Sequence, residues 1–230
     1  MIVYGRNPVR EAIRGPRTVS RVWATRSVLE AEWLAASGSQ VAAASGEELE
    51  RRAGSPDHQG ICAEVSPFRY SDADDVLRDP GALLVVLDQV QDPQNLGAIC
   101  RTAECVGATA VVIGERRSAE VTAAVCKASA GAVEHLPVVR VRNIADFLGD
   151  AKGASFWCYG AYAKAELGYR EVDWRGRAAI VLGSEGRGLR PRVASACDAL
   201  ISIPLRGRTS SLSVGAAAAV LLYGALAARE

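Results

Sequence analysis

The sequence is poor in the residues that build metal, redox and hydrolytic sites. Only two of its 230 residues are histidine, and its six cysteines include no C-x-x-C pair, so the spacing of a zinc site is absent. The patterns G-x-G-x-x-G, G-x-x-x-x-G-K-[ST] and G-x-S-x-G do not occur either. These absences disfavour zinc proteins, nicotinamide or P-loop enzymes with their usual fingerprints, and serine hydrolases.

An excess of one charge is also missing. The 27 Lys and Arg residues against 26 Asp and Glu residues give a net charge of +1, so no whole-molecule field attracts nucleic acid or a membrane surface. Lysine itself is scarce, because 24 of the 27 basic residues are arginine. Arginine binds phosphate and carboxylate groups in a bidentate manner, which is compatible with RNA binding without demonstrating it.

The chain lacks a hydrophobic run of membrane-spanning length. Its most apolar stretch, residues 214–228, is shorter than the roughly 20 residues that a membrane span needs. We therefore predict a buried helix there and no membrane partner. The first ten residues contain no apolar signal stretch, so we expect a cytoplasmic protein whose cysteines are reduced and packed as small apolar side chains.

Two domains are expected from the pattern along the chain. Residues 1–68 alternate short helix and strand signals, and residues 69–80 are polar, acidic and rich in turn formers. Residues 81–230 alternate strands and helices, and several strands are continuous apolar runs, which is typical of parallel strands buried on both faces. The prediction is an α/β fold with a small domain at 1–68, a linker at 69–80 that would allow movement, and a larger domain at 81–230.

Individual elements follow from hydrophobic periodicity. Strands are predicted over residues 19–25, 40–44, 61–68, 83–88, 109–113, 137–141, 155–162, 178–183 and 200–205. Helices are predicted to begin at Asn7-Pro8 and to cover residues 28–37, 47–53, 95–106, 119–129, 143–148 and 191–196, with a last helix from Ser211.

Three loops follow apolar strands, where open α/β sheets tend to build their sites. In the first loop, Asp92-Pro93 starts a helix that carries Asn95 and Arg101; a surface pair between Arg101 and Glu104 is the simpler interpretation. The second loop, residues 183–189, has three glycines in its first six residues, which permit close backbone approach but also occur in plain turns. In the third loop, residues 203–214, we expect a serine at 210 or 211 to cap the last helix.

Taken together and in this order, the three loops resemble motifs 1, 2 and 3 of the SpoU (TrmH-type) RNA 2′-O-ribose methyltransferases of the SPOUT superfamily. The matching strings are VQDPQNLGAICRTA, LGSEGRGL and IPLRGRTSSLSV. Between them, AEVTAAVCKASAGAVEHLPVVRVRNI is similar to the branch that methylates guanosine in 23S rRNA. YGRNPVREAI and DHQGICAEV look like the ends of that branch's small substrate-binding domain, which is L30e-like.

The resemblance implies a SPOUT-type knotted (trefoil) parallel-sheet methyltransferase domain, preceded by the L30e-like α/β domain. It also implies S-adenosylmethionine as methyl donor, RNA (most closely 23S rRNA) as substrate, no metal, and a homodimer whose sites use both subunits. The positions matching the family's cofactor-binding residues are Gly183, Ile203 and Leu212, and those matching its catalytic centre are Asn95, Arg101, Glu185 and Ser211.

The third motif departs from the family pattern. The family's S-L-N-V-S is replaced by Ser211-Leu212-Ser213-Val214-Gly215, so that a hydroxyl stands for an amide and a glycine for a serine. Ser213 offers less hydrogen bonding than the amide. We expect activity to survive if the amide only braces the loop, and rate or target choice to differ if it orients the substrate.

The expected chemistry is methyl transfer to a ribose hydroxyl, in which positioning supplies much of the rate. Arg101 is expected to hold a neighbouring phosphate and to stabilise the developing alkoxide; its alternative role as general base conflicts with a guanidinium that keeps its proton. Asn95 and Ser211 would orient Arg101 or the ribose, and Glu185 would fix the glycine-rich loop. Six arginines within the first 26 residues form either an RNA-contacting patch or a solvated face: Arg6, Arg10, Arg14, Arg17, Arg21 and Arg26.

Other functions remain open on the sequence alone. A nucleotide-dependent metabolic enzyme would bind NAD or ATP and not S-adenosylmethionine. A non-catalytic RNA-binding or ribosome-assembly factor would bind RNA without methylating it. Within the favoured class, tRNA is the alternative substrate, and an rRNA methyltransferase that confers antibiotic resistance would share the same layout.

Overall fold

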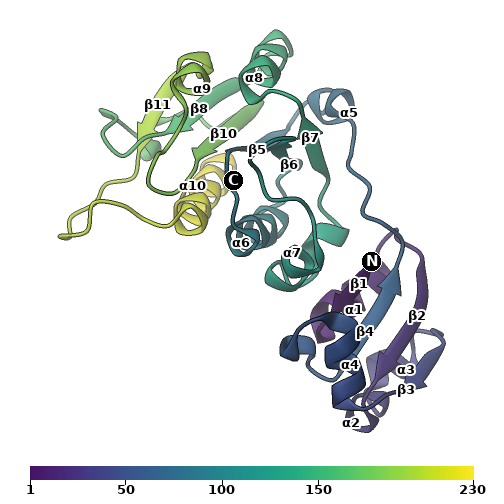
Figure 1. Ribbon diagram of the computed structural model, residues 1–230. Coiled ribbons are helices and arrows are strands. Elements are labelled where there is room, and N and C mark those ends of the chain that lie inside the picture. The colour runs from purple at the N-terminus through teal and green to yellow at the C-terminus, as the bar shows by residue number, and fades with distance from the viewer.

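Two separate β-sheets organise the chain in the computed structural model, which describes residues 1–230 (Figure 1). The first sheet has the strand order β1-β4-β2-β3, and the second has the order β7-β6-β5-β10-β8-β11-β9. The first sheet lies entirely before residue 66 and the second entirely after residue 82. The α/β class predicted from the alternating pattern is confirmed.

The small N-terminal unit is a mixed sheet with short helices. Its strands are β1 (Ile2–Tyr4), β2 (Val19–Ala24), β3 (Val41–Ala43) and β4 (Ile61–Val65), and its helices are α1 (Arg6–Arg14), α2 (Arg26–Leu29), α3 (Glu32–Ala35) and α4 (Gly46–Ala53), followed by a 3-10 turn at Pro56–His58. Strand β4 runs antiparallel to both β1 and β2, and β3 is parallel to β2. Strand β4 therefore has two neighbours in the sheet, β1 and β2, that lie far from it in the sequence.

The single helix expected over residues 28–37 is wrong, because the chain breaks it into α2 and α3. Ala31 has an extended backbone (ψ 122°) between the two. Val28 and Leu34 are both buried, yet on one continuous helix the side chains of residues six apart would point in directions about 120° apart. The break turns both side chains toward the core, so burial overrides local helix propensity.

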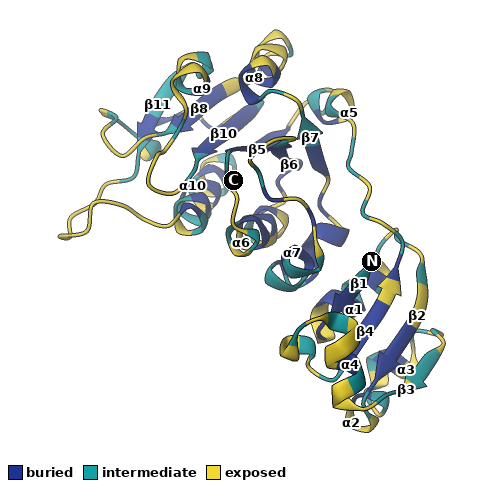
Figure 2. Ribbon diagram, in the orientation of Figure 1, coloured by how far each residue is buried: buried dark blue, intermediate teal, exposed yellow.

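The larger unit is a seven-stranded parallel sheet. Its strands are β5 (Leu83–Asp88), β6 (Ala110–Gly114), β7 (Val138–Val141), β8 (Trp157–Ala161), β9 (Leu167–Gly168), β10 (Ala178–Gly183) and β11 (Ala199–Ser202). Strand β10 pairs with β5 on one side and β8 on the other. All residues of β5 are buried (Figure 2). This confirms the prediction from its continuous apolar run that the strand is covered on both faces.

Helices cover both faces of this sheet. They are α5 (Ala73–Leu77), α6 (Pro93–Cys105), α7 (Ala123–Ala128), α8 (Ile144–Gly153), α9 (Pro191–Ala196) and α10 (Val214–Arg229), with 3-10 turns η2 (Ala132–Glu134) and η3 (Tyr169–Glu171). Side chains of α6, α7 and α10 pack in one hydrophobic cluster, and those of α5, α8 and α9 pack in a second. The trefoil knot implied by the resemblance stays a prediction.

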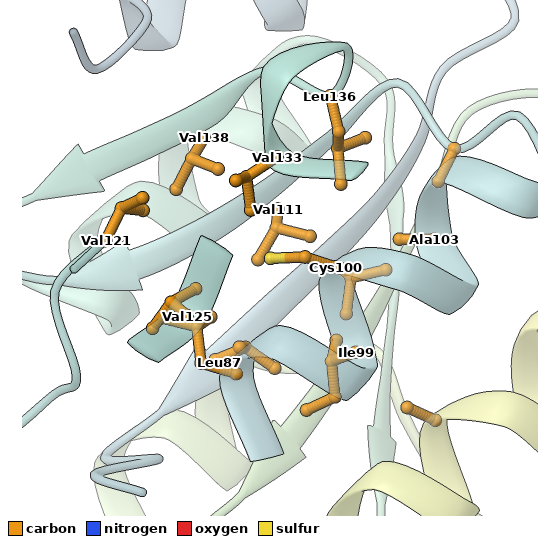
Figure 3. Packing of buried hydrophobic residues seen from close by; sticks show 14 of the residues in the cluster. Leu87, Ile99, Cys100, Ala103, Val111, Val121, Val125, Val133, Leu136 and Val138 are labelled. Atoms are coloured by element: carbon orange, nitrogen blue, oxygen red, sulfur yellow. The ribbon is translucent and has the colours of Figure 1, made fainter. Parts of the chain in front are cut away.

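Close packing of α6 on α7 fixes the helix that carries the first motif. Figure 3 shows Ile99 and Cys100 of α6 among Val125, Val133 and other buried side chains of the same cluster. Gly97 is required at this contact, because a Cβ atom there would lie 2.3 Å from the Cβ of Ala128. The two backbones thus approach at a distance that only glycine permits.

The last helix begins three residues later than predicted. Ser213, not Ser210 or Ser211, is its N-cap, and its Oγ accepts a hydrogen bond from the backbone N–H of Ala216 at 3.2 Å. Each of the three serines is a good cap residue, so the sequence alone does not distinguish them. Neither α10 nor any other helix has the length and apolar character needed to cross a membrane.

Residues 69–80, predicted as a linker, are partly structured. They contain α5, and the backbone N–H of Ser71 donates to the carbonyl of Val138 at 2.9 Å, beside the edge strand β7. The hydroxyl of Tyr70 accepts a hydrogen bond from the backbone of Val121 at 3.0 Å. The segment is therefore fastened to the larger unit at residues 70 and 71.

Candidate functional site

A cleft of about 700 Å³ opens at the carboxyl ends of β10, β8 and β11. Its lining comes from residues 161–164, 182–188, 201, 203, 205, 210–214 and 217. Half of these residues are hydrophobic, and the charged ones are Lys164, Glu185 and Arg187. The second and third loops singled out in the sequence thus form one cavity, although they follow strands that are separated by β8 in the sheet.

The glycine-rich loop folds back onto its own first residue. A Cβ atom at Gly183 would lie 2.1 Å from the backbone carbon of Gly188, so no other residue fits at position 183 without moving the loop. The backbone N–H of Gly188 donates to the carbonyl of Ser184 at 2.9 Å, and Gly188 has a φ of +67°. The result is a tight turn that presents backbone groups to the cleft.

A buried carboxylate anchors the end of this loop. Asp88, the last residue of β5, has no exposed surface. Its two oxygens accept hydrogen bonds from Arg190, one from the backbone N–H at 2.8 Å and one from Nε at 2.7 Å. Because buried charged groups are stable only when paired and hydrogen-bonded, this contact ties the chain after the glycine-rich loop to the neighbouring strand.

We predict that Asp88→Asn lowers the free energy of unfolding by about 1–3 kcal/mol, since Asp88 is fully buried and the amide that replaces it can no longer accept both hydrogen bonds from Arg190. Urea denaturation followed by circular dichroism measures the change. The matched control is Asp173→Asn, which also faces an arginine (Arg175) but at a highly exposed position. Equal stability of the two variants would contradict the anchoring role of Asp88.

Glu185 joins the second loop to the third. Its Oε1 accepts a hydrogen bond from the backbone N–H of Val214, the first residue of α10, at 3.4 Å. A carboxylate at this place satisfies one free N–H and interacts favourably with the positive end of the helix dipole. Glu185 therefore connects the glycine-rich loop to the first residue of α10.

Asn95 lies where α6 meets the start of α10. Its side-chain N–H donates to Asp92, the N-cap of α6, at 3.1 Å. Its Oδ1 lies 3.6 Å from the position that a Cβ atom would occupy at Gly215. Asn95 is thus close to the altered part of the third motif but is not part of the cleft lining.

Arg101 lies apart from the cleft of its own chain. It is exposed on α6 and does not line the cleft. Six residues along a helix separate it from Asn95 by about 9 Å along the axis and place it on a different face. The simpler interpretation, an ion pair between Arg101 and Glu104, is wrong. The ion pairs of the structure involve other arginines.

The remaining predicted residues, Ile203, Ser211 and Leu212, all line the cleft together with Gly183 and Glu185. Sequence reasoning missed Tyr162 and Lys164, which follow β8 and line the same cleft. Strand β8 was predicted, but the loop after it has no distinctive composition. Only the position of β8 beside β10 in the sheet indicates that this loop reaches the cleft.

The cysteines mostly behave as apolar core residues. Burial raises the pKa of Cys100 to about 12 and that of Cys126 to about 11, so both thiols stay protonated at neutral pH. Cys105 is exposed, which corrects the expectation that all six are buried. The structure brings together no group of three His, Cys, Asp or Glu side chains that could hold a metal ion.

Comparisons with known proteins agree with this architecture. The model of the SpoU rRNA Methylase family matches residues 82–223, and the model described as RNA 2′-O ribose methyltransferase substrate binding matches residues 2–71. The chain is 37% identical over 234 aligned positions to an uncharacterized tRNA/rRNA methyltransferase of Synechocystis, covering 96% of this chain and 61% of that protein. It is 34% identical to a putative TrmH family tRNA/rRNA methyltransferase of Bacillus subtilis, covering 96% and 93% of the two chains.

A solved structure shares the fold over both units. The AdoMet-bound rRNA methyltransferase of Sinorhizobium meliloti is 25% identical, with a TM-score of 0.81, and the match covers 97% of this chain and 85% of that one. The family expected from the three motifs is confirmed: the chain belongs to the SpoU family of RNA methyltransferases.

Proposed function

We propose that the protein transfers a methyl group from S-adenosylmethionine to a ribose 2′-hydroxyl of RNA, with a guanosine of 23S rRNA as the target and the cytoplasm as the place of action. The observation that carries the proposal is the cleft itself, in which the glycine-rich loop and the residues before α10 meet around Gly183, Glu185 and Ser211. Residues 1–68 are proposed as the substrate-binding domain, 69–80 as the linker and 81–230 as the methyltransferase domain.

The cleft fits this cofactor in size and in chemistry. Apolar side chains such as Ile203 and Leu212 offer a surface for an adenine ring, and the backbone at Gly183 leaves no room for a Cβ atom. Lys164 and Arg187 offer positive charge to a carboxylate. The rRNA methyltransferase of Sinorhizobium meliloti that shares this fold binds AdoMet.

The bound cofactor supplies an electrophilic methyl group on a sulfonium. Arg101 is proposed to hold the RNA phosphate next to the reacting ribose and to stabilise negative charge on the 2′-oxygen. Asn95 and Ser211 orient these groups through hydrogen bonds. Glu185 keeps the glycine-rich loop on the N-terminus of α10, and no metal ion takes part.

The position of Arg101 supports a homodimer in which each active site uses both subunits. Arg101 is exposed and outside the cleft of its own chain. Helix α10 also presents an apolar face, on which Tyr223 is 53% exposed and Ala216 and Ala227 are exposed as well. These residues are spaced seven and four apart, so they lie on one side of the helix. We propose that a second copy covers this face and brings its Arg101 to the cleft.

Subunit mixing tests this arrangement. Arg101→Ala and Gly183→Ala are each expected to be inactive as homodimers. When the two variants are coexpressed in equal amounts, half of the dimers contain one intact site, so about a quarter of the wild-type activity should return. If Arg101 served the cleft of its own chain, mixing would restore nothing, and each variant mixed with wild type provides the control.

The substrate is tested by transfer of a labelled methyl group from S-adenosylmethionine. Protein-free 23S rRNA and unmodified bulk tRNA are compared with the same enzyme preparation. Incorporation into 23S rRNA but not tRNA is the expected result, and the reverse would establish the alternative substrate. Cofactor binding without incorporation into either RNA or into ribosomal particles would favour a non-catalytic RNA-binding protein.

The altered third motif has a measurable consequence. Gly215→Ser would introduce a hydroxyl close to Asn95, because the Cβ position there is 3.6 Å from Asn95 Oδ1. A new hydrogen bond of about 1 kcal/mol corresponds to roughly a fivefold gain in kcat/KM if Asn95 orients the substrate. Steady-state kinetics measures it, with Gly215→Ala as control, and equal kinetics for both variants would show that Asn95 needs no such support.

A further inference from the structure

The segment between the first and second motifs forms a socket for the small domain. We define the interdomain socket as residues 127–135, which span the end of α7 and η2. None of these residues lines the cleft. Three polar contacts connect it to the first 60 residues. Glu134 binds Arg17, His135 binds Glu11 at 2.9 Å, and Lys127 Nζ donates to the carbonyl of Asp57 at 2.8 Å.

The pair of Arg17 and Glu134 is the buried centre of the contact. The two side chains are 6% and 1% exposed, and Arg17 Nε donates to Glu134 Oε2 at 2.8 Å while a second nitrogen binds the other oxygen. Arg17 also donates to the carbonyl of Ser66 and lies 5.7 Å from the ring centre of Phe68. A bidentate pair with this degree of burial needs a fixed partner geometry.

Glycines on both sides bring the backbones of the two domains together. A Cβ atom at Gly15 would lie 2.9 Å from the Cβ of Glu134, and one at Gly131 would lie 2.7 Å from the Cβ of Glu11. One hydrophobic cluster also includes Val9 of the small domain and Val133 of the socket. Domains that move freely have few such fitted and apolar contacts, so this interface holds one arrangement.

The socket is connected directly to the catalytic helix. Ala128, within the socket, packs against Gly97 of α6 at a distance that excludes any larger residue. Helix α6 carries Asn95 and Arg101. The small domain is therefore docked next to the helix that carries the proposed catalytic residues. In Figure 1 it lies beside α7 and away from β8 and β11, and no socket residue lines the cofactor cleft.

We propose that Arg17 and Glu134 are positioning residues, which lock the substrate-binding domain onto the socket and so hold bound RNA in register with Arg101. This inference rests on the proposed function of the small domain and of Arg101. Misplacing reacting groups by about 1 Å can cost roughly 100-fold in rate. Releasing the small domain should consequently impair RNA methylation and leave cofactor binding intact.

The test uses the full chain with Glu134→Gln, which keeps the shape and removes the charge. We expect the radius of gyration from small-angle scattering to rise, kcat/KM for RNA to fall about 10- to 100-fold, and the affinity for S-adenosylmethionine to stay within about twofold. The charge-reversed double variant Arg17→Glu with Glu134→Arg should regain part of the activity. The matched control is Glu48→Gln. It removes an ion pair with Arg52 that lies within the small domain and takes no part in the contact with the socket.

Unchanged scattering together with unchanged kinetics for Glu134→Gln would overturn the proposal, and so would a parallel loss of cofactor affinity. If Glu134→Gln fails to fold, the pair of Glu11 and His135 in the same interface is removed instead, by the double variant Glu11→Ala with His135→Ala. The same readouts apply. If the unsubstituted protein methylates no RNA, the proposed function fails, while scattering still decides whether the ion pair holds the domains together.

Discussion

Replacing Arg101 by alanine is expected to reduce methyl transfer to RNA about 100- to 1000-fold, the usual cost of removing a group that stabilises charge in the transition state. Affinity for S-adenosylmethionine should stay unchanged, because Arg101 does not line the cleft of its own chain, and the Arg101 that a second copy brings there is proposed to contact the RNA and not the cofactor. Single-turnover methylation with labelled cofactor measures the first quantity, and isothermal titration calorimetry measures the second.

Arg101→Lys separates charge from geometry. Lysine keeps the positive charge but loses the planar pair of donors, so its activity should lie between those of the wild type and Arg101→Ala. The matched control is Arg192→Ala, which removes a highly exposed arginine on α9 that pairs with Asp146. Full activity of Arg101→Ala would remove Arg101 from the mechanism.

Gly183→Ala is expected to weaken cofactor binding strongly. The new Cβ atom would lie 2.1 Å from the backbone of Gly188, so the loop must move. Overpacking typically costs about 1–3 kcal/mol, and a clash with rigid backbone lies at the upper end of that range. If the cofactor binds only the original loop conformation, this cost corresponds to a loss of about 100-fold in affinity. Titration with S-adenosylmethionine measures the change, and circular dichroism shows whether the remaining fold is intact.

Gly207→Ala is the matched control for this substitution. Gly207 belongs to the third loop, and no heavy atom lies within 4 Å of the position that a Cβ atom would take there. Its affinity for the cofactor should equal that of the wild type. Normal binding by Gly183→Ala would mean that the cofactor does not depend on the glycine-rich loop.

The sequence predicted the elements whose signals are local. Continuous apolar runs such as residues 83–88 and 178–183 identified buried parallel strands, and the glycine-rich and serine-rich loops after β10 and β11 were found by composition. The N-cap of α10 was misplaced because serines stand at 210, 211 and 213, and only packing selects Ser213.

Features that depend on long-range contact could not be predicted. Arg17 and Glu134 are 117 positions apart, and neither has a local pattern that distinguishes a buried pair from a solvated one. Likewise, the separation of Arg101 from the cleft depends on how α6 is oriented against the sheet, which periodicity does not give. Such contacts follow from the tertiary fold and not from local propensity.

The position of the methyl group distinguishes a ribose methyltransferase from a base methyltransferase. RNA methylated with labelled S-adenosylmethionine is hydrolysed in alkali, which cleaves a phosphodiester only when the neighbouring 2′-hydroxyl is free to attack it. We expect the label in alkali-stable dinucleotides that yield 2′-O-methylguanosine on further digestion. Label confined to mononucleotides would show a methylated base, and it would contradict the assignment of a ribose methyltransferase.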